Sequence, residues 1–163
     1  MTGETIIVLK PSSVNKGSNF QFEDRVKRGI GKPPPLHIHP NQTECFTVQQ
    51  GQARLMVNKH WQILNKGDSY TVPAGVTHTF EPIGDEELVL HIVFEPALDI
   101  ETFFRSLAQA SSDGKSIILQ IALLNQELAS KFYLGGIPKR LQDVLYIVLA
   151  IPARWLNYQI IGR

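Results

Sequence analysis

Short segments of alternating apolar and polar residues, separated by turn residues, extend to about residue 95 and restrict the fold more than any other feature. Residues 53–57 alternate in this way, and Asn58 and Lys59 form a turn after them. Residues 88–94 are apolar on both faces, which is typical of an internal strand. A succession of short strands joined by turns predicts an all-β sandwich or barrel.

The spacing of the apolar residues becomes helical after this β-rich part. Asp99 can cap a helix whose first turn contains Glu101, where the helix dipole favours an anion. Residues 117–131 carry apolar side chains at helical spacing, and Pro138 suits the first turn of a third helix. We therefore predict a β-barrel domain over residues 1–98 and a helical C-terminal extension over residues 99–163.

Composition excludes several classes of protein. The net charge of +1 provides no basic surface of the kind that binds nucleic acid. Cys45 is the single cysteine, so the chain has no intramolecular disulfide framework, which fits a reducing compartment. Residues 1–10 contain four consecutive apolar residues, too few for the apolar region of a signal peptide. These features predict a cytoplasmic protein.

His37, His39 and Glu44 have the spacing of metal ligands. Residues two apart in a strand point to the same face, roughly 6.6 to 6.8 Å apart along the strand. The two imidazoles can therefore converge on one ion with bonds of about 2.0 to 2.2 Å. Residues 40–43 form a turn, so Glu44 lies at the start of the next strand and can add an oxygen ligand.

A third histidine follows a second turn. Residues 72–75, Val-Pro-Ala-Gly, end one strand and enter a turn, because proline presets φ and glycine accepts a positive φ. His78 begins the strand that follows. The sequence thus predicts one metal site assembled from His37, His39, Glu44 and His78.

These two stretches resemble the motifs of the cupin superfamily. The first matches G-x5-H-x-H-x4-E-x6-G at Gly31, His37, His39, Glu44 and Gly51. The second matches G-x5-P-x-G-x2-H-x3-N at Gly67, Pro73, Gly75 and His78, and Pro82 replaces the final asparagine, which is not a ligand in the family. The resemblance covers residues 20–96. It implies a double-stranded β-helix, or jelly-roll barrel, with one metal bound near its mouth.

The donor set suits one divalent transition metal ion per chain. Three neutral imidazoles and a carboxylate leave open positions on a five- or six-coordinate ion. Fe, Mn, Ni, Co, Cu and Zn all accept such ligands, so the ligands alone do not identify the metal. An alternative is a barrel that has lost its metal, but four polar groups in an apolar barrel without an ion would be costly.

The walls of a pocket are harder to predict than its ligands. Four residues share faces with ligands or with inward positions, and core packing is an equal alternative for each: Phe46, Val48, Tyr70 and Phe80. His91 could face inward and transfer protons, although an outward position in the packed sheet is favoured. His60 lies in a hairpin turn and is expected on the surface.

Open coordination positions on the metal would allow a small-molecule ligand or substrate to bind to it and react. The leading hypothesis is a metal-dependent enzyme of the dioxygenase-like oxidoreductase type, with no catalytic acid or base identified. One alternative is a non-catalytic cupin that binds a metal or small molecule. Another is a metal-dependent isomerase or lyase acting on a sugar or keto acid, in which His91 or Tyr70 moves the proton. The fold alone does not choose among them.

The apolar C-terminal segment, residues 144–161, nearly reaches the roughly 20 residues that span a bilayer. Pro152 and Arg154 oppose a membrane span, whereas a helix at the membrane interface stays open as an alternative, because Trp155 and Tyr158 suit a headgroup region. We expect one helical stripe to pack on the barrel or on a partner subunit: Leu141, Leu145, Val148, Pro152 and Trp155. A homodimer is predicted, and sedimentation of a species at the 18.3 kDa chain mass alone would contradict it.

Overall fold

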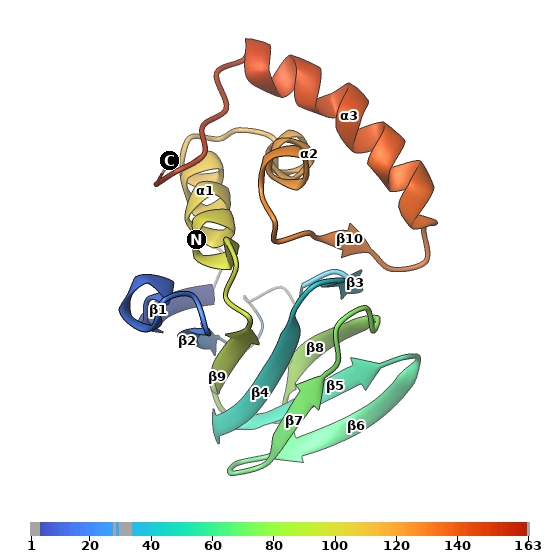
Figure 1. Ribbon diagram of the computed structural model, residues 1–163. Helices are drawn as coiled ribbons and strands as arrows, with labels where there is room; N and C mark the ends of the chain where they lie inside the picture. Colours follow the sequence, from blue (N-terminus) through green and yellow to red (C-terminus); the bar gives the residue numbers. More distant parts are fainter. Residues whose placement is uncertain (1–3, 28, 30–33, 163) are drawn as a thin grey trace.

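Two five-stranded antiparallel sheets form the β-rich part of the protein (Figure 1). The computed structural model describes residues 4–27, 29 and 34–162. One sheet contains, in spatial order, β1 (Glu4–Lys10), β2 (Phe20–Val26), β9 (Leu88–Glu95), β4 (Thr43–Gln50) and β7 (Ser69–Val72). The other contains β10 (Tyr133–Leu134), β3 (His37–Ile38), β8 (His78–Ile83), β5 (Gln52–Val57) and β6 (His60–Asn65). A short 3-10 helix, η1 (Ser12–Asn15), joins β1 to β2.

The core lies between the two sheets, because side chains alternate along each strand and one face of each sheet points inward. Five of the innermost side chains are at most 1% exposed and belong to one continuous cluster: Phe20, Phe46, Leu55, Leu90 and Phe94. The all-β core and its helical extension, both predicted from the hydrophobic pattern, are confirmed. Arg54 lies on the outer face and pairs with Glu81.

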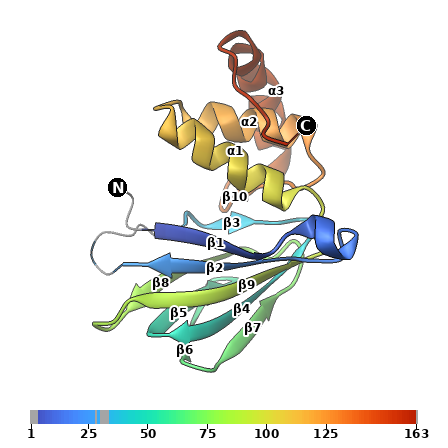
Figure 2. The same ribbon diagram turned by 90° about the vertical axis from the view of Figure 1, so that its left-hand side faces the viewer.

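Three helices follow the strands: α1 (Ile100–Ser112), α2 (Ile117–Glu127) and α3 (Lys139–Trp155). Figures 1 and 2 show them gathered at one end of the β core, with α3 farthest from the sheets. Asp99 occupies the N-cap position of α1, as predicted, but its carboxylate makes no cap hydrogen bond. It accepts instead from the Ala129 backbone, because the loop after α2 passes beside it.

The extension also contributes to the β core. Strand β10 pairs with β3, Tyr133 with Ile38 and Leu134 with His37. Buried helical side chains, among them Ile100 and Phe103, belong to the same hydrophobic cluster as the barrel. The boundary between residues 98 and 99 therefore separates two kinds of secondary structure that share one core. That these two parts are separate domains remains a prediction.

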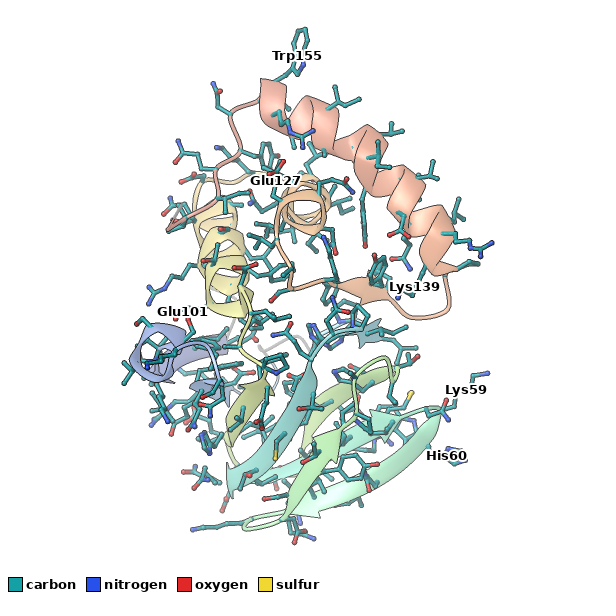
Figure 3. The ribbon with its side chains drawn as sticks, in the orientation of Figure 1. Lys59, His60, Glu101, Glu127, Lys139 and Trp155 are labelled. Atoms are coloured by element: carbon teal, nitrogen blue, oxygen red, sulfur yellow. The ribbon has the colours of Figure 1, made fainter. Side chains whose placement is uncertain are left out.

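Helix α3 packs on α2 with a different face from the one predicted. Its buried residues are Gln142, Tyr146, Ala150 and Ala153. The predicted apolar stripe faces away from the barrel, and Trp155, 85% exposed, projects from the end of the helix (Figure 3). The expectation that this stripe packs on the barrel is wrong, because α3 meets α2 and β10 with its opposite face, on which Gln142 bonds to Leu134. Within the described part of the chain, no helix combines the length and hydrophobicity that a membrane span requires.

Candidate metal centre

The second sheet brings two of the predicted ligands directly opposite each other. His37 in β3 and His78 at the start of β8 form a cross-strand pair. Strand β3 ends at Ile38, and His39 follows it. The backbone N–H of Gly75 donates a 2.9 Å hydrogen bond to the carbonyl oxygen of His39. Gly75 has φ of 80°, a conformation natural to glycine. The turns of the two motifs are thus joined by one hydrogen bond.

Glu44 approaches the three histidines from the other sheet. It lies on the inner face of β4, and its Oε2 is 2.8 Å from Nε2 of His78 and 3.7 Å from Nε2 of His39. All four side chains are buried, and one ligand atom from each lies within 4.8 Å of every other. The structure thus brings all four predicted ligands together. Gly31, which begins the first motif, lies outside the described residues.

Backbone carbonyls orient two of the imidazoles for ligation. Nδ1 of His37 lies 2.8 Å from the Pro35 oxygen, and Nδ1 of His78 lies 2.9 Å from the Val76 oxygen. Since a carbonyl only accepts, each Nδ1 carries a proton. Nε2 of His37 then presents a lone pair to the cluster, whereas Nε2 of His78 is hydrogen-bonded to Glu44 and must lose its proton to bind a metal. Nδ1 of His39 has no hydrogen bond of good geometry among the described residues. This donor set, together with the fold, indicates a bound metal ion.

The electrostatics of the cluster keep two imidazoles neutral, the form that binds metal. Burial lowers the pKa of His37, and the neighbouring histidines lower it further. Burial also lowers the pKa of His39 to about 4, although the charge of Glu44 favours the cation. For His78, burial opposes the charged form, but the hydrogen bond and charge of Glu44 outweigh it and raise the pKa. Glu44 is therefore most strongly coupled to His78.

A cavity of about 510 Å³ opens from these ligands towards the helices. This volume lies in the range of small-molecule sites. His37, His39 and Glu44 line it, and most of the remaining wall is aliphatic or aromatic. Side chains of α1 and α2 complete the wall, including Phe103 and Ile121. The helical extension thus encloses the space beside the ligands.

Of the predicted pocket residues, Phe80 lines this cavity. Phe46 and Val48 are buried in the core and do not line it, although the Phe46 ring lies 6.1 Å from that of His78. Tyr70 packs against the core from β7 and also lies outside the cavity wall. His91 is on the outer face of β9 beside Gln21, because Leu90 and Ile92 take the inward positions. Neither Tyr70 nor His91 therefore lines this cavity, and His91 has the outward position that was favoured for it.

Sequence reasoning missed Phe132, which comes from the extension. Its ring stacks on His37 at 5.0 Å between centroids and 18° between planes. It also contacts the ring of Phe103 on α1. No strand or helix pattern marks this residue, since the strand β10 that follows it has two residues.

A second missed residue, Asp24, is a buried carboxyl group in the same cavity. It is 3% exposed and follows Phe20 and Phe22 on the inner face of β2. Burial, followed by the charges of Glu4 and Glu44, raises the pKa of Asp24 to about 8. The signal was present in the sequence, because period-two alternation places residue 24 inward.

Replacing Asp24 with asparagine is expected to change how stability depends on pH. Folded Asp24 keeps its proton up to about pH 8, whereas in the unfolded chain it ionises near the ordinary aspartate pKa of 3.8. Between these values folding takes up a proton, so the contribution of Asp24 to the free energy of unfolding falls as pH rises. The Tm of Asp24→Asn relative to wild type should therefore increase from pH 5 to pH 8.

Thermal unfolding of both proteins with metal chelated measures this difference. Asp113→Asn, at the exposed end of α1, serves as the control and should follow wild type at each pH. A constant Tm difference between Asp24→Asn and wild type across this range would show that Asp24 does not hold its proton.

Comparisons with known proteins agree with this fold and site. Residues 25–94 match the family model described as the cupin domain. The chain is 39% identical over 97 residues to the probable oxidoreductase virH of Hypocrea virens, covering 55% of this chain and 44% of that protein. It is 29% identical over 133 residues to the oxidoreductase iacF of Pestalotiopsis fici, covering 73% and 65%. The alignments therefore span less than two thirds of each relative.

Solved structures share the fold. The cupin domain of Schizosaccharomyces pombe Cnp3 has a TM-score of 0.52 at 16% identity, covering 71% of this chain and 74% of that chain. A structure of oxalate decarboxylase has a TM-score of 0.50 at 28% identity, covering 60% and 27%. The family match, these folds and the buried histidine–glutamate cluster agree, and residues 25–94 of this chain form a cupin domain.

Proposed function

We propose that this chain is a metal-dependent small-molecule enzyme of the dioxygenase-like oxidoreductase type. His37, His39, Glu44 and His78 hold one divalent transition metal ion. The observation that carries the proposal is the convergence of four buried donors, three of which line an apolar cavity large enough for a substrate. A redox metal bound there supplies activation of dioxygen beside a chelating substrate.

The residues of the chain position the reactants and exclude water. The Pro35 and Val76 carbonyls fix the tautomers of His37 and His78, so both present Nε2 to the site. Phe132 stacks on His37 and restricts the rotation of its ring. The apolar walls from α1 and α2 keep the space beside the ligands poor in water, which strengthens electrostatic interactions within it.

The two curated relatives support an oxidoreductase, since both carry that word in their names. A metal-dependent lyase is the second candidate, favoured by the 28% identity to oxalate decarboxylase. The two residues expected to transfer the proton in such a lyase, Tyr70 and His91, do not line the cavity. A cytoplasmic location and a homodimer remain predictions from the sequence.

The test begins with elemental analysis of the purified protein, followed by oxygen uptake with catechol, thiol and diketone substrates. Iron at about one ion per chain, together with oxygen uptake, is the expected result. His37→Ala should lack both the metal and the uptake, while His60→Ala should keep both. Zinc or nickel without oxygen uptake would contradict the oxidoreductase and favour a lyase, isomerase or binding protein.

A further inference from the structure

The cavity beside the candidate metal ligands has a strongly aromatic wall. Five phenylalanines line it, from β2, β8, α1 and the segment before β10: Phe22, Phe80, Phe103, Phe104 and Phe132. Figures 1 and 2 show α1 and α2 over the end of the β core at which these elements meet. Aromatic walls of this kind favour a flat, apolar ligand, because ring stacking adds to the burial of surface.

One polar group in this wall has an unused hydrogen-bonding position. Asp24 is 3% exposed, and its Oδ1 has no hydrogen-bond partner among the residues that the structure describes. Its carboxyl group shares a hydrogen bond with Glu4 of the neighbouring strand, which also lines the cavity. Buried polar atoms in proteins are nearly always paired, so this unpaired oxygen indicates a ligand group at this position.

The described wall contains no lysine or arginine that could balance an anion. Arg25, next to Asp24 in sequence, points outward and pairs with Glu23. Burial raises the pKa of Asp24 to about 8, and the charge and hydrogen bond of Glu4 add to this, so Asp24 retains its proton at neutral pH. A protonated carboxyl group keeps an acceptor oxygen, and a negatively charged ligand group beside Asp24 and Glu4 would be unfavourable.

We propose that this cavity binds an uncharged aromatic molecule and that Oδ1 of Asp24 accepts a hydrogen bond from a hydroxyl group of that molecule. This inference rests on the proposed function, since it names the substrate class of the same site. The molecule lies with its ring among the phenylalanines and with one oxygen at Asp24. Sugar phosphates and other anionic substrates are excluded from the part of the cavity beside Asp24.

Methyl 4-hydroxybenzoate and 4-hydroxybenzoate are a matched pair of probes, because they differ in a neutral ester and a carboxylate. Because a carboxylate can itself bind a metal ion, both probes are titrated calorimetrically into metal-free as well as metal-loaded protein. The ester should bind at least about tenfold more tightly than the acid, because burying a carboxylate without a cation is costly. This preference should persist in the metal-free protein.

Variants of Asp24 then test the hydrogen bond. Asp24→Leu should weaken ester binding about threefold to tenfold, the effect of one net hydrogen bond, whereas Asp24→Asn keeps the acceptor oxygen and should stay within about twofold of wild type. Asp113→Leu, outside the cavity, is the matched control and should bind as wild type does.

Three outcomes would overturn the inference: equal or tighter binding of the acid, binding of neither probe, or unchanged ester affinity in Asp24→Leu. Failure of the proposed function gives a different result. In that case the wild-type protein takes up no metal or no oxygen, while its preference for the ester and its dependence on Asp24 are retained.

Discussion

Replacing His37, His39 or His78 with alanine is expected to lower metal affinity at least about 100-fold. Each histidine provides one donor atom of a buried cluster whose ligand atoms lie within 4.8 Å of one another. Loss of a residue that only orients a ligand already costs about 10- to 100-fold, so loss of the ligand itself should cost as much or more. Metal content after reconstitution and dialysis, measured by mass spectrometry, checks this expectation.

His60→Ala is the matched control for these variants. His60 is exposed at the start of β6, on the side of the β core away from the helices (Figure 3). Its removal should leave metal occupancy unchanged. Occupancy of the wild-type protein should also fall on acidification, since protons compete for the same nitrogens. Wild-type protein that stays metal-free with each of Fe, Mn, Ni, Co, Cu and Zn would refute the site.

The β core could be predicted from the sequence because several of its strands alternate between buried and exposed residues. In β5, Ala53 and Leu55 are buried and the residue before each is exposed, which is the pattern that period-two reasoning detects. The ligands could be predicted because His37 and His39 are close in sequence and each motif contains turn residues. Gly51 has φ of 74°, and a Cβ at this position would lie only 2.7 Å from the Glu87 oxygen, so the turn there requires glycine.

The cavity wall could not be predicted in the same way, because residues distant in sequence form it. Phe132 reaches His37 only because β10 adds to the edge of β3, and a two-residue strand has no periodicity to detect. His91 illustrates the opposite difficulty. A strand that is apolar on both faces does not reveal which face points inward until its partners are known.

The helical extension makes the site a product of the whole described chain. Helix α1 adds Phe103 to both the core cluster and the cavity wall, and the segment after α2 supplies Phe132. A barrel without these residues would expose its inner apolar surface at the end where the ligands lie. The extension therefore stabilises the fold and encloses the site through the same contacts.

Removal of residues 99–163 is accordingly expected to yield aggregated protein. Truncation deletes the partner strand of β3 and uncovers apolar side chains that are buried against Phe104 in the intact protein, including Phe22 and Phe94. Large exposed apolar patches and an unpaired strand edge both promote association. Soluble yield and size-exclusion chromatography of the truncated and intact chains measure the effect.

Two aromatic substitutions test the same dependence without truncation. Phe103 is 2% exposed within the shared core, so Phe103→Ala should lower the free energy of unfolding by about 3 to 5 kcal/mol. Trp155→Ala removes a larger side chain that is 85% exposed, and it should change stability by no more than about 0.5 kcal/mol. A soluble, cooperatively folded truncated protein that retains metal, together with a small effect of Phe103→Ala, would establish residues 1–98 as an independent domain. If the helices and the barrel stabilise each other through one core, the truncated protein should aggregate and Phe103→Ala should be strongly destabilised.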